Sequence, residues 1–276
     1  TKNILEKLDI VNKSTDVSQW TSFLEKLNTP SKKVCIGMVG KKDYLDNCYK
    51  SVQESLFHAA VTGNNAEIII KKIDAETLEE SDNAASFFEG VEGIVIPGNY
   101  GQRGFMGLLK TVKYARENKI PYLGIDLGMQ LMAIETARSL CGWQDADTTE
   151  FIQNSTHPVI SLPEEQSSPS DGVMKLGASQ ITIEQNTKLH EIYNSDSISE
   201  RHRSKYCFDK RYANEVSEHG LIISAYSASD RQTESFEWKN HPWGIGVQFH
   251  PEFISRPSKP HPLFNSFIKA VIGNQK

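Results

Sequence analysis

The segment Gly124-Ile-Asp-Leu-Gly-Met-Gln130 places an acidic side chain between a short apolar run and a helix-like stretch. A buried strand that turns sharply into a helix lifts one side chain above the sheet, as in a nucleophile elbow. The glycines suit so tight a turn because a Cβ there would clash. The lifted side chain is Asp126, for which we expect a positive or otherwise strained φ. Taken alone, an aspartate at this place is more simply the N-cap of a helix.

Two further segments carry polar groups at the ends of apolar runs. Val247-Gln-Phe-His-Pro-Glu252 ends a run in a histidine, and Glu252 is placed to fix the tautomer that a general base needs. Backbone N–H groups of the loop Ile96-Pro-Gly-Asn-Tyr-Gly-Gln-Arg-Gly104 could form an oxyanion hole. Each segment also has an ordinary interpretation, as a structural histidine and as a glycine-rich βα loop.

The elements that must position these residues alternate along the chain. Apolar runs at 34–39, 67–70, 93–96, 121–125 and 246–249 are typical of buried strands, and helical spacing marks 44–61, 104–118, 128–140 and 262–272. This alternation predicts an α/β fold with a central, mainly parallel sheet and helices on both faces. Shorter segments at 158–162, 180–184, 221–224 and 235–238 predict added antiparallel strands. The Ser/Pro-rich stretch 164–171 is expected to be a mobile loop.

The chain divides into a segment 1–33 and a single large domain over 34–276. Two stretches of the first segment, 4–8 and 20–27, have helical spacing, and a polar linker follows them. Residue 1 is threonine, which suggests a piece of a longer protein.

Composition excludes several classes of protein. The formal net charge of −5 gives no sign of a nucleic-acid surface, and no apolar run is long enough for a membrane span. No signal peptide opens the chain, so we expect a cytoplasmic protein. Gly37-Met-Val-Gly40-Lys41 lacks the spacing of a phosphate-binding loop. We expect no metal site, because no CxxC pair occurs among the cysteines, which are Cys35, Cys48, Cys141 and Cys207.

Taken in order, these segments resemble the glutaminase domain of CTP synthase, a class I glutamine amidotransferase. That family reads VPGGFGxRG, then GxCLGMQ, then GVQFHPEF, and the matching residues here are 96–104, 124–130 and 246–253. Further matches are Ala146–Phe151, Met174–Gly177 and Glu200–Arg203. The resemblance covers about residues 34 to 270, and the opening stretch resembles the end of a synthase domain with its linker.

The resemblance implies a catalytic set and a binding set. In the family the elbow cysteine attacks glutamine, forms a γ-glutamyl thioester and releases ammonia to a synthase domain, while the histidine and glutamate after GVQF activate it. The corresponding residues here are Asp126, His250 and Glu252. The residues with implied substrate-binding roles are Gly98, Asn99, Leu127, Gln130, Glu150 and Lys205.

Three of these positions depart from the family. Asp126 stands at the cysteine, and a carboxylate is a far weaker nucleophile toward an amide than a thiolate is. Asn99 replaces a glycine, and Lys205 replaces an arginine, which loses the bidentate fork but keeps the charge. Because a single engineered change would not explain all three, we favour natural loss of glutaminase chemistry. We also expect an ion pair between Asp126 and His250, which would raise the pKa of the histidine and lower that of the aspartate.

The hypothesis that we favour is therefore an inactive amidotransferase domain with a regulatory, structural or assembly role, and whether the domain is an enzyme at all stays open. One alternative is an active glutamine hydrolase with an atypical nucleophile. Another is a pocket that binds a different small molecule, for instance a cationic one. The resemblance implies no cofactor in this domain. ATP, UTP and Mg²⁺ belong to a synthase domain, which we expect as the partner in cis or in trans, with neither nucleic acid nor membrane as partner.

Overall fold

The computed structural model describes residues 2–9, 16–163 and 174–275, and its centre is a sheet of nine strands. One side of the sheet is parallel, in the order β2-β1-β3-β4-β12. Its strands are β1 (Lys32–Gly40), β2 (Ala66–Asp74), β3 (Gly93–Ile96), β4 (Tyr122–Ile125) and β12 (Gly244–Val247). Strands β3, β4 and β12 are completely buried, which is why their sequences are continuous apolar runs. The predicted parallel core is confirmed.

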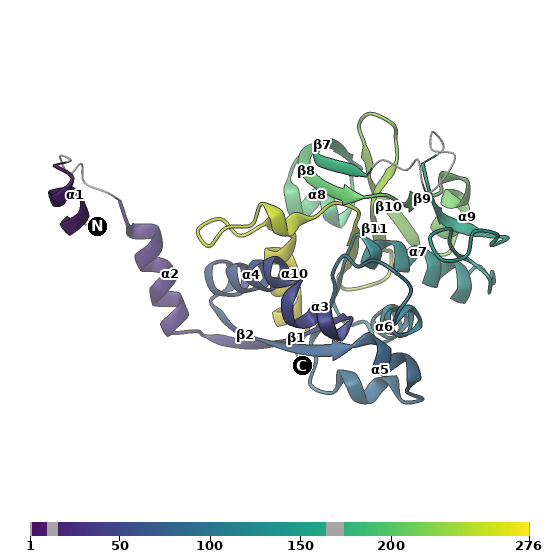
Figure 1. Cartoon of the computed structure of the whole chain (residues 1–276), viewed down its shortest axis with the longest axis horizontal. Helices are drawn as coiled ribbons and strands as arrows, with labels where there is room; N and C mark the ends of the chain where they lie inside the picture. The colour runs from purple at the N-terminus through teal and green to yellow at the C-terminus, as the bar shows by residue number, and fades with distance from the viewer. Residues whose placement is uncertain (1, 10–15, 164–173, 276) are drawn as a thin grey trace.

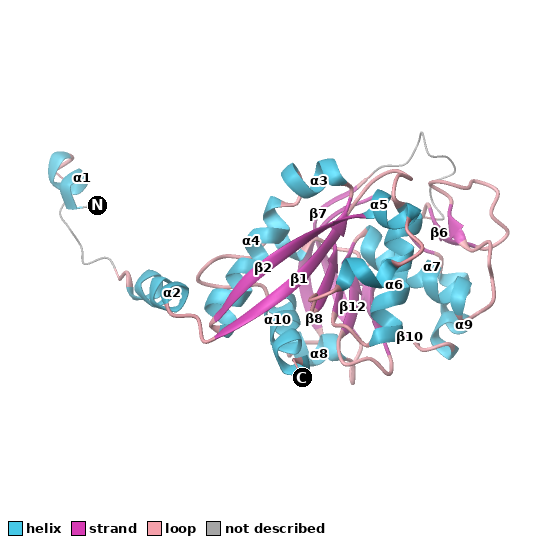
Figure 2. Cartoon of the chain, turned by 90° about the horizontal axis from the view of Figure 1, so that it is seen from below, coloured by secondary structure: helices cyan, strands magenta, loops and turns pink. Residues whose placement is uncertain are grey.

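Helices cover both faces of this core (Figure 2). One face is packed by α3 (Lys42–Asn47), α4 (Lys50–His58), the π-helix η1 (Ala59–Gly63) and α10 (Pro262–Asn274). The other carries α5 (Ala75–Glu80), the 3₁₀ turn η2 (Ala84–Phe88), α6 (Phe105–Asn118) and α7 (Leu127–Ser139). Two separate apolar clusters, one beneath each layer of helices, form the hydrophobic core.

Antiparallel strands continue the sheet beyond β12, in the order β11-β10-β7-β8. They are β7 (Lys175–Ile183), β8 (Ser197–Ser204), β10 (Leu221–Ser227) and β11 (Thr233–Trp238). Helix α8 (Lys188–Tyr193) joins β7 to β8, and the turn η3 (Lys210–Tyr212) and α9 (Ala213–Glu218) precede β10. A separate small sheet has the order β5-β6-β9, with β5 (Asp147–Thr148), β6 (Pro158–Ser161) and β9 (Cys207–Phe208). The predicted antiparallel additions are thus confirmed.

Three expectations about individual elements are wrong. The helix expected over 44–61 breaks at Cys48 and Tyr49, because the Tyr49 ring is buried against Gly40 and the chain turns there to place it. Strand β7 begins at Lys175 rather than 180, since its first half is partly exposed and lacks an apolar run. Strand β12 ends at Val247 rather than 249, and after it the His250 N–H bonds to Arg201 O of β8 at 2.8 Å. The expected mobile loop 164–171 lies outside the described residues.

The N-terminal segment forms α1 (Lys2–Lys7) and α2 (Ser18–Asn28), the latter projecting from the sheet at the start of β1 (Figure 1). The α2 helix is held at its C-terminal half by Phe23, which packs edge-on against Phe57, and by Lys26, whose Nζ donates to Thr62 O at 2.7 Å. The predicted helix over 20–27 is therefore confirmed. None of the helices in the described part of the chain is long and apolar enough to cross a membrane.

Candidate active site

Asp126 occupies the turn between β4 and α7, with φ 52° and ψ −106°. The turn is tight: a Cβ on Gly124 would lie 2.5 Å from the Gly128 carbonyl, and one on Gly128 would lie 2.4 Å from Ile96 O. Only glycine fits at these two places, and the positive φ of Asp126 is a strained conformation that active sites often hold. The expected elbow geometry is present.

The carboxyl group of Asp126 is buried, with 4% of the residue exposed. Its Oδ1 accepts a hydrogen bond from Gln248 Nε2 at 2.6 Å. Burial raises the pKa of Asp126 from 3.8 to about 7, against the opposing influence of the His250 charge and the Leu127 N–H. The expected lowering of this pKa is wrong, because removal of the carboxylate from water outweighs its attraction to the histidine.

His250 is buried beside Glu252, and its Nδ1 lies 2.8 Å from Glu252 Oε1. Burial alone would lower the pKa of His250, but the hydrogen bond and charge of Glu252, with a further contribution from Asp126, raise it overall. The imidazole ring stacks on Phe253 with ring centroids 5.0 Å apart. Its Nε2 is buried and has no hydrogen-bond partner among the described residues, and the Arg203 backbone also contributes to the raised pKa of His250.

Asp126 and His250 face each other across Gly98. A Cβ built on Gly98 would lie 3.0 Å from His250 Cε1 and 3.4 Å from Asp126 Oδ2. The glycine therefore leaves room for both side chains where they approach. The end of β3 supplies Gly98, the end of β4 supplies Asp126, and His250 follows β12, so neighbouring parallel strands bring the three together.

A cavity of about 280 Å³ opens beside Asp126. It is lined by Asn99, Tyr100, Asp126, Gln130, Glu150, Met174, Lys205 and Tyr206. Gln130 Nε2 donates to Tyr206 O at 3.1 Å and to Gln248 Oε1 at 3.3 Å, which fixes one wall. Asn99 Oδ1 accepts from the Tyr100 N–H at 2.8 Å, whereas its buried Nδ2 has no partner among the described residues. An unpaired buried donor at a cavity is a place for a ligand acceptor.

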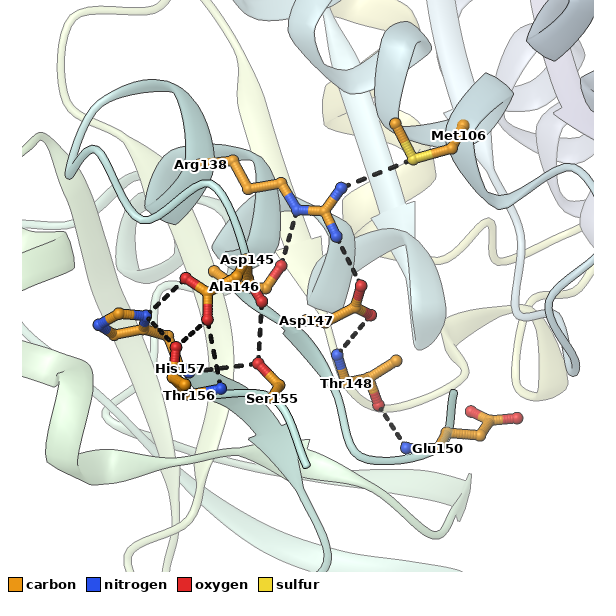
Figure 3. A network of polar contacts seen from close by, with 10 residues as sticks. All are labelled: Met106, Arg138, Asp145, Ala146, Asp147, Thr148, Glu150, Ser155, Thr156 and His157. Atoms are coloured by element: carbon orange, nitrogen blue, oxygen red, sulfur yellow. Dashed lines mark hydrogen bonds and ion pairs between the residues drawn. The ribbon is translucent and has the colours of Figure 1, made fainter. Parts of the chain in front are cut away.

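Glu150 reaches this cavity from the loop after β5. Its Oε1 accepts from the Gly101 N–H at 3.2 Å, and burial raises its pKa. The loop is held by a polar network that Figure 3 shows: Arg138 contacts Asp147 at 2.5 Å, and Thr148 Oγ1 accepts from the Glu150 N–H at 3.1 Å. A helix and a small sheet thus fix a carboxylate on the wall of the cavity that Asp126 also lines.

Lys41 supports the loop that carries Gly98 and Asn99. Its buried Nζ donates to Tyr100 O and, at 3.1 Å, to Gly101 O. Burial, with the neighbouring Arg103 charge, lowers the pKa of Lys41. In the sequence, Lys41 is considered only as part of a segment that lacks the spacing of a phosphate-binding loop. No neighbouring residue indicates that Lys41 donates to the carbonyls of Tyr100 and Gly101. The role of Gln248 is not predicted for a similar reason, because its partners Asp126 and Gln130 are distant in the sequence, at the start of α7.

The structure brings together the residues named from the sequence. Asp126, His250 and Glu252 form one buried group, and Gly98 and Leu127 contribute backbone beside it. The other named residues line the cavity, and they are Asn99, Gln130, Glu150 and Lys205. Their roles in binding or catalysis stay predictions.

Known proteins are similar to this chain in sequence and in fold. The profile of the family described as glutamine amidotransferase class-I matches residues 44–270. The chain therefore belongs to the class I glutamine amidotransferases. Within that family it is homologous to the glutaminase domain of CTP synthase. The structure of this domain from Trypanosoma brucei with bound acivicin matches with a TM-score of 0.82 and 34% identity, over 88% of this chain and 95% of that chain.

Curated relatives extend the comparison. The CTP synthase of Protochlamydia amoebophila is 43% identical over 272 residues, which are 98% of this chain and 50% of the relative. That of Flavobacterium psychrophilum is 43% identical over 274 residues, 98% of this chain and 51% of the relative. The chain thus spans about half the length of the curated relatives it matches. A glutamine amidotransferase from Thermotoga maritima shares the fold, with a TM-score of 0.52 and 13% identity over 87% of this chain and 96% of that chain.

Proposed function

We propose that this chain is an amidotransferase domain of a CTP synthase-like protein in which glutamine hydrolysis has been lost, with Asp126 at the position of the nucleophilic cysteine. The observation that carries the proposal is the placement of Asp126 at the strained elbow, facing His250 with Glu252 behind it. These are the places of a nucleophile, a base and its orienting carboxylate.

Chemistry argues against turnover at this elbow. Attack by a carboxylate on the glutamine amide would form a mixed anhydride and release ammonia. A thiolate releases the same ammonia but is the stronger nucleophile, and it forms a thioester, which is less activated than an anhydride. Asp126 also holds less negative charge than a normal aspartate, because its pKa of about 7 leaves a substantial protonated fraction at neutral pH. The ionised fraction would place a negative charge beside the oxyanion that the site should stabilise.

The residues that line the cavity keep more of the family's pattern than the nucleophile position does. Glu150 and Lys205 put opposite charges on the cavity wall, as recognition of an amino acid's ammonium and carboxylate groups requires. We therefore propose that the cavity binds glutamine or a related small molecule without cleaving it. A regulatory or assembly role toward a synthase domain, in cis or in trans, follows from this proposal, and ATP, UTP and Mg²⁺ would bind that domain.

A changed ligand is the second candidate, and one observation favours it. Among the described residues, the buried Nδ2 donor of Asn99 has no partner, and Asn99 and Asp126 line the same cavity. A donor and an acceptor on the wall of one cavity suit a ligand that carries both an acceptor and a cationic or N–H group.

Ammonia release from glutamine, compared with calorimetric titration of glutamine into the same sample, separates these cases. Binding without ammonia supports the proposal, and ammonia formation above that of Asp126→Asn would contradict it. Failure of glutamine to bind, with binding of a cationic analogue instead, would support the second candidate. Glutamine and acivicin, the ligand bound in the Trypanosoma brucei structure, are suitable first probes, and intact mass shows whether acivicin attaches covalently.

A further inference from the structure

A second group of chemically capable side chains lies at the far end of α7, away from the cavity. Cys141, Glu215 and His219 each place one potential ligand atom within 4.8 Å of the others. All three side chains are partly buried. Cys141 follows α7, whereas Glu215 lies in α9 and His219 directly after it, and the two helices are neighbours in Figures 1 and 2.

The backbone fixes Cys141 at the C-terminal end of α7. Its N–H bonds to Thr136 O at 3.1 Å, and the Trp143 N–H bonds to Ala137 O at 3.0 Å. Gly142 between them has φ 80°, the left-handed conformation with which helices commonly end. The last carbonyls of a helix make its C-terminal end negative, which favours a cation there. The 13-residue α7 thus carries Asp126 at one end and Cys141 at the other.

The second pair of ligands is pre-arranged on one helical turn. Residues four apart on a helix lie on the same face, and the His219 N–H bonds to Glu215 O at 3.2 Å. The His219 ring places Nδ1 2.9 Å from the same carbonyl oxygen and 3.6 Å from Glu215 Oε1. Donation from Nδ1 to that carbonyl would leave the lone pair of Nε2 for a metal ion. Metal-binding histidines are oriented in this way, by donation from the other ring nitrogen to a carbonyl or carboxylate.

We propose that Cys141, Glu215 and His219 form a binding site for a zinc ion, with water as the fourth ligand. A thiolate, a carboxylate and an imidazole together suit Zn²⁺ better than the harder cations Mg²⁺ and Ca²⁺. Tetrahedral ligands at zinc stand about 3.5 Å apart, so these atoms need to approach by about an ångström, within the rotamer freedom of half-exposed side chains. Binding would release the thiol proton to solvent and form the Zn–S bond.

Such an ion would link the C-terminal end of α7 to α9. The helix that begins at Asp126 would then be fixed at its opposite end to the segment before β10, which belongs to the antiparallel half of the sheet. The site is independent of glutamine hydrolysis, since none of its ligands lines the cavity at Asp126.

Cobalt(II) titration of the full chain under reducing conditions tests the site directly. We expect one Co²⁺ per chain, a thiolate-to-cobalt charge-transfer absorption, and loss of that absorption when Zn²⁺ is added. Cys141→Ser should abolish the charge-transfer absorption, and Cys48→Ser, which changes an exposed cysteine outside the cluster, should preserve it. Absence of this absorption in the unmodified chain, or its survival in Cys141→Ser, would overturn the proposal.

A second measurement tests the other two ligands. In competition with a chromophoric zinc chelator, His219→Gln and Glu215→Gln should each weaken Zn²⁺ binding by about tenfold or more. The matched control is His190→Gln, because His190 is also a half-exposed histidine, paired with Asp196 at 2.9 Å. Equal affinity of the His219 and His190 variants would refute the assignment. Far-ultraviolet circular dichroism of each variant shows whether it folds.

Discussion

Gln248 donates its side-chain N–H to Oδ1 of Asp126 at 2.6 Å, so the elbow carboxyl group is held from one side by a neighbouring strand's extension. Gln130 donates in turn to Gln248 Oε1 at 3.3 Å. The two glutamines therefore form a short relay from the first turn of α7 back to the residue before it. A carboxyl group fixed in this way is a structural component of the pocket as well as a candidate reactive group.

The first prediction concerns activity. The unmodified chain should release no ammonia from glutamine above the level of Asp126→Asn, and acivicin should leave no covalent label at residue 126. Asp126→Cys should restore only weak activity, because Asn99 and Lys205 remain. The triple variant Asp126→Cys/Asn99→Gly/Lys205→Arg should exceed it, since residues of one catalytic unit are not additive. Full activity in the single variant would show that the other two positions are neutral.

The second prediction is a pH dependence of stability. The pKa of Asp126 is raised from 3.8 to about 7 in the folded state, so the fold binds this proton more tightly than the unfolded chain does. The associated stabilisation is complete below about pH 4 and is lost as pH rises through about 7. A shift of this size corresponds to up to about 4 kcal/mol.

Asp126→Asn isolates that contribution, because asparagine cannot ionise. Relative to the unmodified protein, the variant should gain free energy of unfolding between pH 5 and pH 8, as measured by urea denaturation at both values. The His250 pKa is raised partly by Asp126, so the two proteins should also differ near the histidine's own titration. An identical difference at pH 5 and pH 8 would show that Asp126 titrates normally.

The third prediction concerns Gly98. A Cβ there would lie 3.0 Å from His250 Cε1 and 3.3 Å from Asp126 Cβ, so Gly98→Ala must push the two side chains apart. We expect a loss of about 1–2 kcal/mol in the free energy of unfolding, together with weaker ligand binding in the cavity. Gly273→Ala is the matched control, since that glycine lies in α10 with open space around it. The control should be stabilised by about 0.5–1 kcal/mol.

The fourth prediction concerns Lys41. Lys41→Met keeps the aliphatic bulk but leaves the carbonyls of Tyr100 and Gly101 without their donor. Loss of these bonds should cost about 1–3 kcal/mol in urea denaturation and weaken ligand binding, because the loop also carries Asn99. Lys42→Met, at the exposed neighbouring position, should change neither quantity measurably. A Lys41 variant as stable as the Lys42 variant would show that the loop holds itself.

The parallel half of the fold and the elbow could be predicted because their signals are local. A fully buried strand such as β4 reads as an apolar run, and the glycines on both sides of Asp126 mark its turn. Strand β8 gave no such signal. Its buried side chains include Glu200, His202 and Ser204, which are polar, so its alternation is invisible to hydrophobicity.

Long-range polar partners explain what the sequence could not provide. Lys41 meets its carbonyl acceptors about sixty residues away, and nothing around Lys41 encodes that contact. The pKa of Asp126 depends on how completely the fold removes it from water, which residue types alone do not determine. The sequence around Cys141 did not indicate a metal site, because the proposed co-ligands Glu215 and His219 lie in a distant part of the chain.

Strand β8 lies at the very edge of the nine-stranded sheet, yet two of its carbonyls close the pocket. Arg201 O accepts the His250 N–H at 2.8 Å, and Arg203 O accepts the Tyr100 hydroxyl at 2.9 Å. Both contacts join segments that are far apart along the chain, and contacts of this kind tend to form late in folding. The elbow can therefore be assembled by its own strand and helix before the histidine is anchored. Substitutions that weaken the β7–β8 ribbon should accelerate unfolding more than they slow folding.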